Sequence, residues 1–224
     1  MSGRTAPVAG LLLAAGGGRR LGAPKGLMRD PDGTPRAARV SDQLHTAGCA
    51  PIVVVVGAAA EEVAALLPAS VRPVRAEDWS EGMGGSLRAG LNSLTGIEAA
   101  AESRTPGRST VPPQPEAALV MLVDLPGVNE FAVRRVITHA REHFHEFDDA
   151  LVRATWNGQP GHPVLIGRRH WRAAAECAVG DQGARELLSG PGVETVECGD
   201  LGSGADVDYP EDITSLPMVR RTDS

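Results

Sequence analysis

An apolar segment that runs straight into a glycine-rich, basic loop is the feature that most constrains the fold of this chain. Residues 12–25 read Leu-Leu-Ala-Ala-Gly-Gly-Gly-Arg-Arg-Leu-Gly-Ala-Pro-Lys. Glycines let backbone N–H groups approach anionic oxygens without a Cβ in the way, and Arg19, Arg20 and Lys25 add positive charge. The pattern favours a phosphate-handling loop after a buried strand, and the alternative is a solvated turn rich in Gly and Arg.

Two widespread phosphate loops do not fit this spacing. The P-loop has Gly directly before its Lys and Ser or Thr directly after it, whereas Pro24 and Gly26 flank Lys25. The dinucleotide fingerprint has Gly at its first, third and sixth positions, and counting from Gly16 the sixth position is Leu21. The loop therefore belongs to neither class.

Short apolar runs alternate with amphipathic segments along the chain. The runs, typical of strands buried on both faces, cover residues 8–14, 52–56, 71–74, 118–123, 151–154, 164–166 and 193–196. Helical patterns cover residues 35–47, 60–67, 85–94, 129–147, 168–178 and 182–188. This order predicts a single-domain, three-layer α/β sandwich with a mostly parallel central sheet and ligands at the carboxyl ends of the strands.

Size, charge and cysteine usage limit the class of protein. A chain of 224 residues is expected to form one domain, and its net charge of −6 argues against nucleic acid or a membrane as a partner. Residues 103–116 carry four prolines and predict a mobile surface insertion. Cys49, Cys177 and Cys198 are widely spaced, so we expect reduced, packed thiols. The apolar start resembles a secretory signal only superficially, and we expect a cytoplasmic enzyme.

Two further positions are candidates for ligand binding. Asp124 follows the run 118–123 and is expected to emerge beside the glycine-rich loop, where one or two carboxylates with phosphate oxygens would hold Mg²⁺. The alternative for Asp124 is a turn residue or helix N-cap. Gly85 and Ser86 start a helical pattern whose free N–H groups could bind a base or ribose, and the alternative is an ordinary helix cap.

Six motifs, in order along the chain, resemble those of the MobA-like nucleotidyltransferases. They are Leu13-Ala14-Ala15-Gly16 with Arg20-Leu21-Gly22 and Lys25, residues 79–87, Val123-Asp124-Leu125-Pro126, Gly161-His162-Pro163, residues 180–185, and residues 206–212. The last three are similar to the branch of molybdenum cofactor cytidylyltransferases. The resemblance implies a Rossmann-like nucleotidyltransferase fold, with nucleotide bound by about residues 8–126 and acceptor by about residues 127–216.

The resemblance also implies roles for individual residues. The implied nucleotide-binding residues are Leu13, Ala14, Ala15, Gly16, Gly17, Gly18, Arg20, Lys25, Gly85 and Ser86. The implied Mg²⁺ ligands are Asp124 and Asp208, with Asp206 as a substitute. Only one of Asp206 and Asp208 is expected to bind the ion. His162 and Asp181 are the implied acceptor-binding residues, and a structural hydrogen bond is an equal alternative for His162.

The implied reaction is attack of an acceptor phosphate oxygen on the α-phosphorus of a nucleoside triphosphate, with Arg20, Lys25 and Asp124 as catalytic residues. Ala15 favours CTP over GTP within the resemblance, with molybdopterin or its molybdenum form as acceptor and a molybdoenzyme or delivery protein as partner. The alternatives are another nucleotide with a sugar phosphate or phosphorylated small acid, and a nucleotide-binding module without turnover.

One competing motif points to zinc. His139-Ala140-Arg141-Glu142-His143 fits the His-x-x-Glu-His pattern of a zinc peptidase family, with both histidines on one helix face. Such a site also needs a third ligand and a cleft, whereas the segment has the charged pattern of an exposed helix face. We therefore favour the exposed helix.

Overall fold

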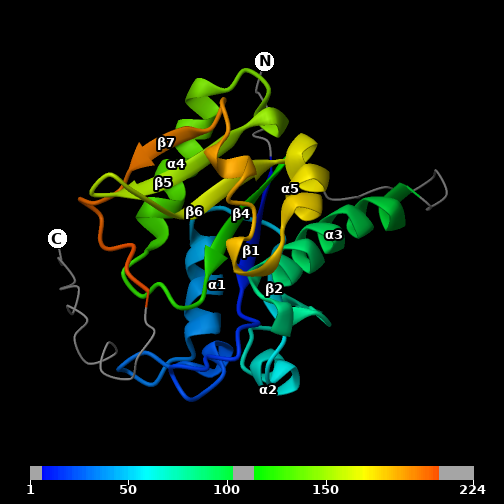
Figure 1. Cartoon of the computed structure of the whole chain (residues 1–224), viewed down its shortest axis with the longest axis vertical. Helices are drawn as coiled ribbons and strands as arrows, with labels where there is room; N and C mark the ends of the chain where they lie inside the picture. Colours follow the sequence, from blue (N-terminus) through cyan, green and yellow to red (C-terminus); the bar gives the residue numbers. More distant parts are fainter. Residues whose placement is uncertain (1–6, 103–113, 207–224) are drawn as a thin grey trace.

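Strand β1 (Val8–Leu13) lies inside a seven-stranded sheet whose order is β3-β2-β1-β4-β6-β5-β7. The computed structural model describes residues 7–102 and 114–206 (Figure 1). The other strands are β2 (Ile52–Val56), β3 (Arg72–Arg75), β4 (Ala117–Leu122), β5 (Leu151–Trp156), β6 (Gln159–Gly167) and β7 (Glu194–Glu197). β1 pairs in parallel with β2 and β4 and is buried throughout, because helices cover both of its faces.

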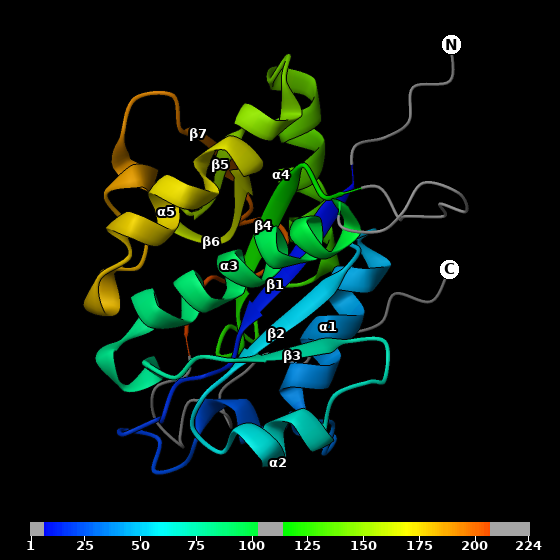
Figure 2. The same ribbon diagram turned by 90° about the vertical axis from the view of Figure 1, so that its right-hand side faces the viewer.

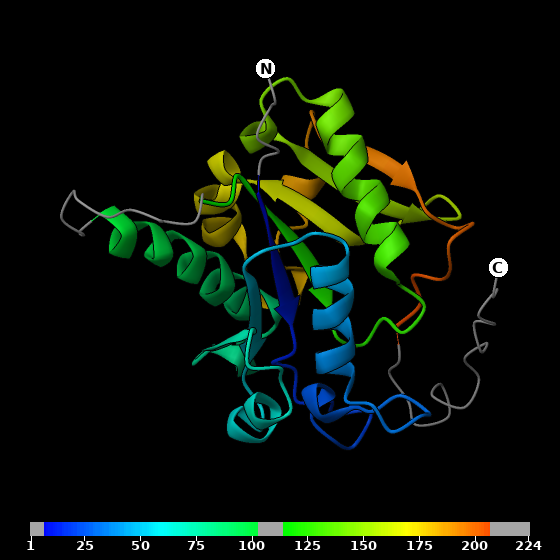
Figure 3. The ribbon, with the colours of Figure 1, turned by 180° about the vertical axis from the view of Figure 1, so that it is seen from behind.

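Helices on both faces of the sheet complete three layers (Figures 2 and 3). On one face lie α1 (Arg36–Thr46), α4 (Glu130–His143) and the shorter α2 (Ala60–Ala65), and on the other lie α3 (Met83–Glu102) and α5 (Trp171–Cys177). The remaining helical turns are η1 (Lys25–Leu27), η2 (Trp79–Glu81), η3 (Phe147–Asp149), η4 (Arg168–His170), η5 (Gly180–Gln182) and η6 (Leu187–Ser189). The predicted three-layer α/β sandwich with a mostly parallel sheet is confirmed.

Strand β6 departs from the parallel pattern, because it runs antiparallel to both β4 and β5. A tight hairpin joins β5 to β6 through Asn157 and Gly158, which have φ angles of +52° and +78°. Asn-Gly is the preferred pair for such a turn, because both residues tolerate positive φ. Glu197 of β7 accepts hydrogen bonds from the backbone N–H of Gly158 (3.0 Å), the hydroxyl of Thr155 (2.8 Å) and the backbone N–H of Asn157 (2.8 Å), and these bonds help to lower the pKa of its carboxyl to about 2. The hairpin is thus held against β7.

Three local predictions are wrong. The runs 71–74 and 193–196 form the edge strands β3 and β7, which expose residues instead of burying both faces. The predicted helix over residues 182–188 is replaced by the turns η5 and η6. Gly183 has a φ of +54°, a conformation that ends a helix. The predicted insertion lies outside the described residues from position 103 to 113.

The cysteines form no disulfide, as predicted. Cys49 and Cys198 are buried, and burial raises the pKa of the Cys49 thiol to about 12 and of the Cys198 thiol to about 11. Both thiols are therefore protonated and unreactive at neutral pH. Among the described residues, no helix is long and apolar enough to cross a membrane.

Asn129 links the start of α4 to the chain after β7, and its substitution tests this link. Its side-chain oxygen accepts hydrogen bonds from Phe131 N (3.0 Å) and Ala132 N (3.2 Å), and its Nδ2 donates to Leu201 O (2.7 Å). We expect Asn129→Ala to lower the free energy of unfolding by about 1–2 kcal/mol in urea denaturation. Asn129→Asp keeps the cap but loses the hydrogen bond to Leu201 O, so its free energy of unfolding should fall between those of the wild type and Asn129→Ala. An Asn129→Ala variant as stable as the wild type would contradict the capping role.

Candidate active site

The glycine-rich loop after β1 curls back on itself and returns Lys25 to the end of the strand. Lys25 N donates to Gly16 O (2.9 Å), and Gly22 N donates to Gly18 O (2.8 Å). Gly18 has a φ of +57°, and a Cβ there would lie 1.9 Å from Ala23 O. A Cβ on Gly26 would lie 2.7 Å from Ala14 O, so η1 packs directly on the backbone that follows β1. The loop conformation therefore depends on glycine at these positions.

The loop brings Lys25 onto Asp124, which follows β4. Lys25 Nζ lies 2.5 Å from Asp124 Oδ2, although the two residues are 99 positions apart. β1 and β4 are in parallel register, with Leu13 opposite Leu122, so the segments that follow them emerge side by side. Asp124 is only 8% exposed, and the ion pair compensates its charge.

A buried arginine holds the backbone just before Asp124. Arg36, at the start of α1, donates from Nε to Val123 O (2.9 Å) and from Nη1 to Asp30 Oδ1 (2.6 Å). Asp30 also pairs with Arg39. We missed Arg36 in the sequence because its partner lies 87 positions away. An arginine at the apolar start of a helix is the only signal that could have indicated it.

A cleft of about 470 Å³ opens over the loop, and we call it the loop compartment. It lies between the loop, the turn η2 and the start of α3. Six of the predicted nucleotide-binding residues line it: Leu13, Ala15, Gly16, Gly17, Lys25 and Ser86. Ala14 packs into the core on the α1 side, and Gly85 lies against Asp78, where a Cβ would be 2.7 Å from Asp78 Cγ. These two therefore support the loop compartment without lining it.

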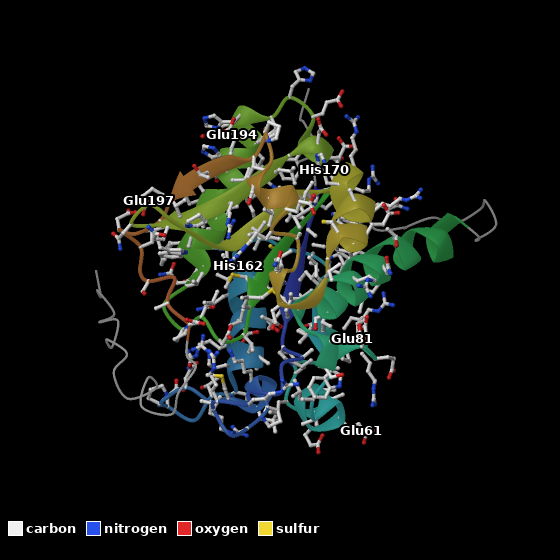
Figure 4. The ribbon with its side chains drawn as sticks, in the orientation of Figure 1. Glu61, Glu81, His162, His170, Glu194 and Glu197 are labelled. Carbon is white, nitrogen blue, oxygen red and sulfur yellow. The ribbon has the colours of Figure 1, made fainter. Side chains whose placement is uncertain are left out.

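A second cleft of about 500 Å³ adjoins the first, and we call it the hairpin compartment because residues of the β5–β6 hairpin line it. Lys25, Asp124 and Asp181 line both compartments. Gly18, Arg20, His162 and Asp206 line the hairpin compartment. In Figure 4, Glu81 marks the loop compartment and His162 the hairpin compartment. The Lys25–Asp124 pair thus lies where the two compartments meet.

Arg153 of β5 is a site residue that the sequence analysis missed. It lines the hairpin compartment and a recess of about 120 Å³ that opens beside it. Its Nε is buried and has no hydrogen-bond partner among the described residues. Burial, and then the charge of Arg185, lower its pKa. A buried N–H of a charged group without a partner is costly, and an anionic ligand would compensate it. Its place inside an apolar run was the available signal.

His162 lies beside Arg153 and is neutral at physiological pH. Burial and the charge of Arg153 lower the pKa of its ring to about 4, against the opposing effect of Asp124. Its backbone carbonyl accepts a hydrogen bond from Trp156 Nε1 (2.8 Å), which fixes its place on β6. The ring is therefore available as a neutral hydrogen-bonding group, not as a cation.

Two of the three carboxylates that were predicted to bind a metal lie within the described residues. Asp124 Oδ1 has no hydrogen-bond partner among the described residues, so it could bind a cation while Lys25 contacts Oδ2. Asp206 is exposed and lines the hairpin compartment, and Asp208 lies outside the described residues. One buried carboxylate that lines both clefts fits the preference of Mg²⁺ for few carboxylates.

Comparison with known proteins agrees with this geometry. The profile of the MobA-like NTP transferase domain matches residues 10–196. The chain therefore belongs to the MobA-like NTP transferase family, whose enzymes are nucleotidyltransferases.

Individual relatives show how widely the fold is used. The chain is 33% identical over 221 residues to nicotine blue oxidoreductase of Paenarthrobacter nicotinovorans, covering 93% of this chain and 96% of that protein. Rv0371c of Mycobacterium tuberculosis H37Rv is 25% identical, with a TM-score of 0.70 over 94% of this chain and 97% of its own; it has also been solved with manganese. CMP:2-keto-3-deoxy-manno-octonic acid synthetase complexed with CTP shares the fold at 12% identity, with a TM-score of 0.65 over 93% of this chain and 95% of its own.

The lowered pKa of His162 predicts a pH dependence of stability. Because the ring binds a proton at about pH 4 in the folded state and near 6.5 when unfolded, the unfolded state binds more protons between these values. Stability from this group is fully present above about pH 6.5 and is lost as the pH falls towards 4. We expect His162→Gln to flatten this loss in urea denaturation series, with the exposed His145→Gln as matched control. A His162 ring that titrates near pH 6.5 by NMR would contradict it.

Proposed function

We propose that the protein transfers a nucleotidyl group from a nucleoside triphosphate to a phosphorylated small acceptor and releases pyrophosphate. In its specific form, CMP passes from CTP to molybdopterin or its molybdenum form. The observation that carries the proposal is the contact of 2.5 Å between Lys25 and Asp124, where the two compartments meet. A transfer between two bound anions needs their reacting groups to meet beside compensating charge.

The loop compartment is proposed to hold the triphosphate. Gly16 and Gly17 line it without side chains, and Arg19 and Lys25 add positive charge. Trp79 lines the same cleft beside Gly17 and offers an apolar face to a base or ribose. Ala15 supports CTP, because it stands where guanylyl-transferring members of the resembled family have glycine.

The hairpin compartment is proposed to hold the acceptor. Arg153 supplies a half-buried positive charge for an anionic group, and neutral His162 offers a hydrogen bond without repelling it. Asp181 lines both compartments and would contact either ligand. An acceptor phosphate oxygen would then attack the α-phosphorus, the bond to the β-phosphate would break, and pyrophosphate would leave.

A divalent ion, Mg²⁺ in this proposal, would be held by Asp124 and by Asp206 or Asp208. When bound, it would neutralise charge on the phosphate that is transferred. Lys25 holds Asp124 in place in the free protein, and its ammonium group would compensate the triphosphate and the departing pyrophosphate. Because of this pairing, Asp124 is positioned before any ligand arrives.

One relative favours a second candidate function. The protein that is 33% identical to this chain is described as an oxidoreductase that acts on nicotine blue. A redox reaction on a small organic molecule in the same cleft is therefore the competing proposal. It needs an electron donor in place of the triphosphate, so the two proposals differ in what the loop compartment binds and in whether pyrophosphate forms.

Substrate pairing tests the first proposal directly. We expect pyrophosphate release with Mg²⁺, CTP and molybdopterin, and slower release with GTP, ATP or UTP. Sugar phosphates and phosphorylated small acids serve as parallel acceptors. Release only with one of those would keep nucleotidyl transfer and replace the acceptor. No pyrophosphate release with any pair would overturn nucleotidyl transfer. Oxidation of NADH or NADPH that depends on a small organic electron acceptor would then establish the redox function.

Removal of the Lys25 ammonium group tests the contact between Lys25 and Asp124 on which the proposal rests. We expect Lys25→Ala to lower kcat by about 10²–10³, because the triphosphate charge is no longer compensated and Asp124 loses its partner. Lys25→Arg should retain part of the rate. Arg29→Ala is the matched control, since Arg29 is an exposed cation close in sequence that lines neither compartment. A Lys25→Ala rate within a few-fold of wild type would exclude this role.

Lys25 also allows a binding measurement without mutation. It is the only lysine in the sequence, so ¹³C reductive methylation labels Lys25 and the terminal amine alone. CTP with Mg²⁺ should shift the Lys25 signal in an NMR titration and leave the terminal signal in place. An unchanged Lys25 signal at saturating CTP would separate a failure to bind from a failure of turnover.

A further inference from the structure

A second cluster of ligand-type side chains lies outside the cleft, between α4 and the edge strand β7. His139 and His143 are four residues apart on α4 and share one helix face, with their ring centroids 3.9 Å apart. Glu194 of β7 approaches them, and its Oε2 lies 2.7 Å from His139 Nε2. One ligand atom from each of the three residues lies within 4.8 Å of the other two.

The His143 ring is oriented in the way that metal-binding imidazoles usually are. Its Nδ1 lies 2.9 Å from the backbone carbonyl oxygen of His139. When Nδ1–H donates to that carbonyl, Nε2 carries the lone pair and is free to bind a metal. His143 is exposed, so water can complete the coordination.

The donor set selects the class of ion. Two imidazoles and one carboxylate suit Zn²⁺ and similar transition ions, whereas Mg²⁺ and Ca²⁺ prefer oxygen ligands only. Tetrahedral Zn²⁺ needs ligand atoms roughly 3.3 Å apart, given bonds of about 2.0–2.1 Å. The ligand atoms lie within 4.8 Å of one another, so some must move closer together. The exposed His143 and the Glu194 side chain, which is 42% exposed, have the freedom to do so.

We propose that His139, His143 and Glu194 form a binding site for Zn²⁺ or a similar divalent transition ion, which fastens β7 to α4. Strand β7 pairs with β5 at the edge of the described sheet, and a bond to α4 would tie that edge to the helix layer. The structure thus supplies the third ligand that the His-x-x-Glu-His pattern lacked. Glu194 lies well apart from Glu81 and His162 in Figure 4, so the site is separate from the cleft.

Zinc titration of the full chain tests the site. Asp124→Asn serves as the background, because it removes the buried carboxylate of the cleft. In this background we expect one Zn²⁺ per chain by isothermal titration, unaffected by excess Mg²⁺. His143→Gln and Glu194→Gln should each weaken binding at least tenfold, and His145→Gln, an exposed histidine two residues beyond His143, should not. Equal affinity in His143→Gln and His145→Gln would overturn the proposal.

A measurement on the unsubstituted chain avoids any effect of the variants on folding. Co²⁺ should broaden the NMR signals of the His139 and His143 rings before those of the other histidines, and Zn²⁺ should reverse the broadening. Broadening that begins at other histidines, or that Zn²⁺ leaves unchanged, would overturn the site. Since neither readout involves turnover, failure here is distinct from failure of the nucleotidyl transfer.

Discussion

The contact between Lys25 and Asp124 is the interaction on which the rest of the site depends. It joins the loop after β1 to the chain after β4, and these strands are paired in parallel register. The loop reaches Asp124 only because Gly18 and Gly26 allow a close return past Ala23 and Ala14. The same contact lies where the loop and hairpin compartments meet. Charge compensation therefore places a carboxylate and an ammonium group together before any substrate binds.

Local patterns were enough to predict the layers of the fold and the two halves of this contact. The apolar run at residues 8–14 has the length and composition of a buried strand, and the glycines that follow it indicate a loop. Asp124 stands directly after an apolar run in the same way. The edge strands β3 and β7 were predicted with the wrong burial, because a short apolar run has the same pattern whether or not a neighbour covers it.

Arg36 and Arg153 could not be predicted, because their roles come from partners far away in the sequence. Arg36 acts through the carbonyl of Val123, and this pairing exists only once α1 packs beside the end of β4. The role of Arg153 follows from its buried Nε, which has no hydrogen-bond acceptor among the described residues. Asn157-Gly158 was a readable signal for the hairpin that carries both Arg153 and His162, and it was not used.

The reversal of chain direction at β6 explains why the loop compartment was easier to predict from the sequence than the hairpin compartment. The loop compartment lies at the ends of the parallel strands β1 and β4, within a fold that a solved structure shares at 12% identity. The hairpin compartment depends on individual side chains of an antiparallel hairpin, such as Arg153 and His162. Hairpin residues can change without disturbing the parallel core, so the chemistry of the hairpin compartment can diverge while the fold persists. The 33% identical relative described as an oxidoreductase is consistent with such divergence on one scaffold.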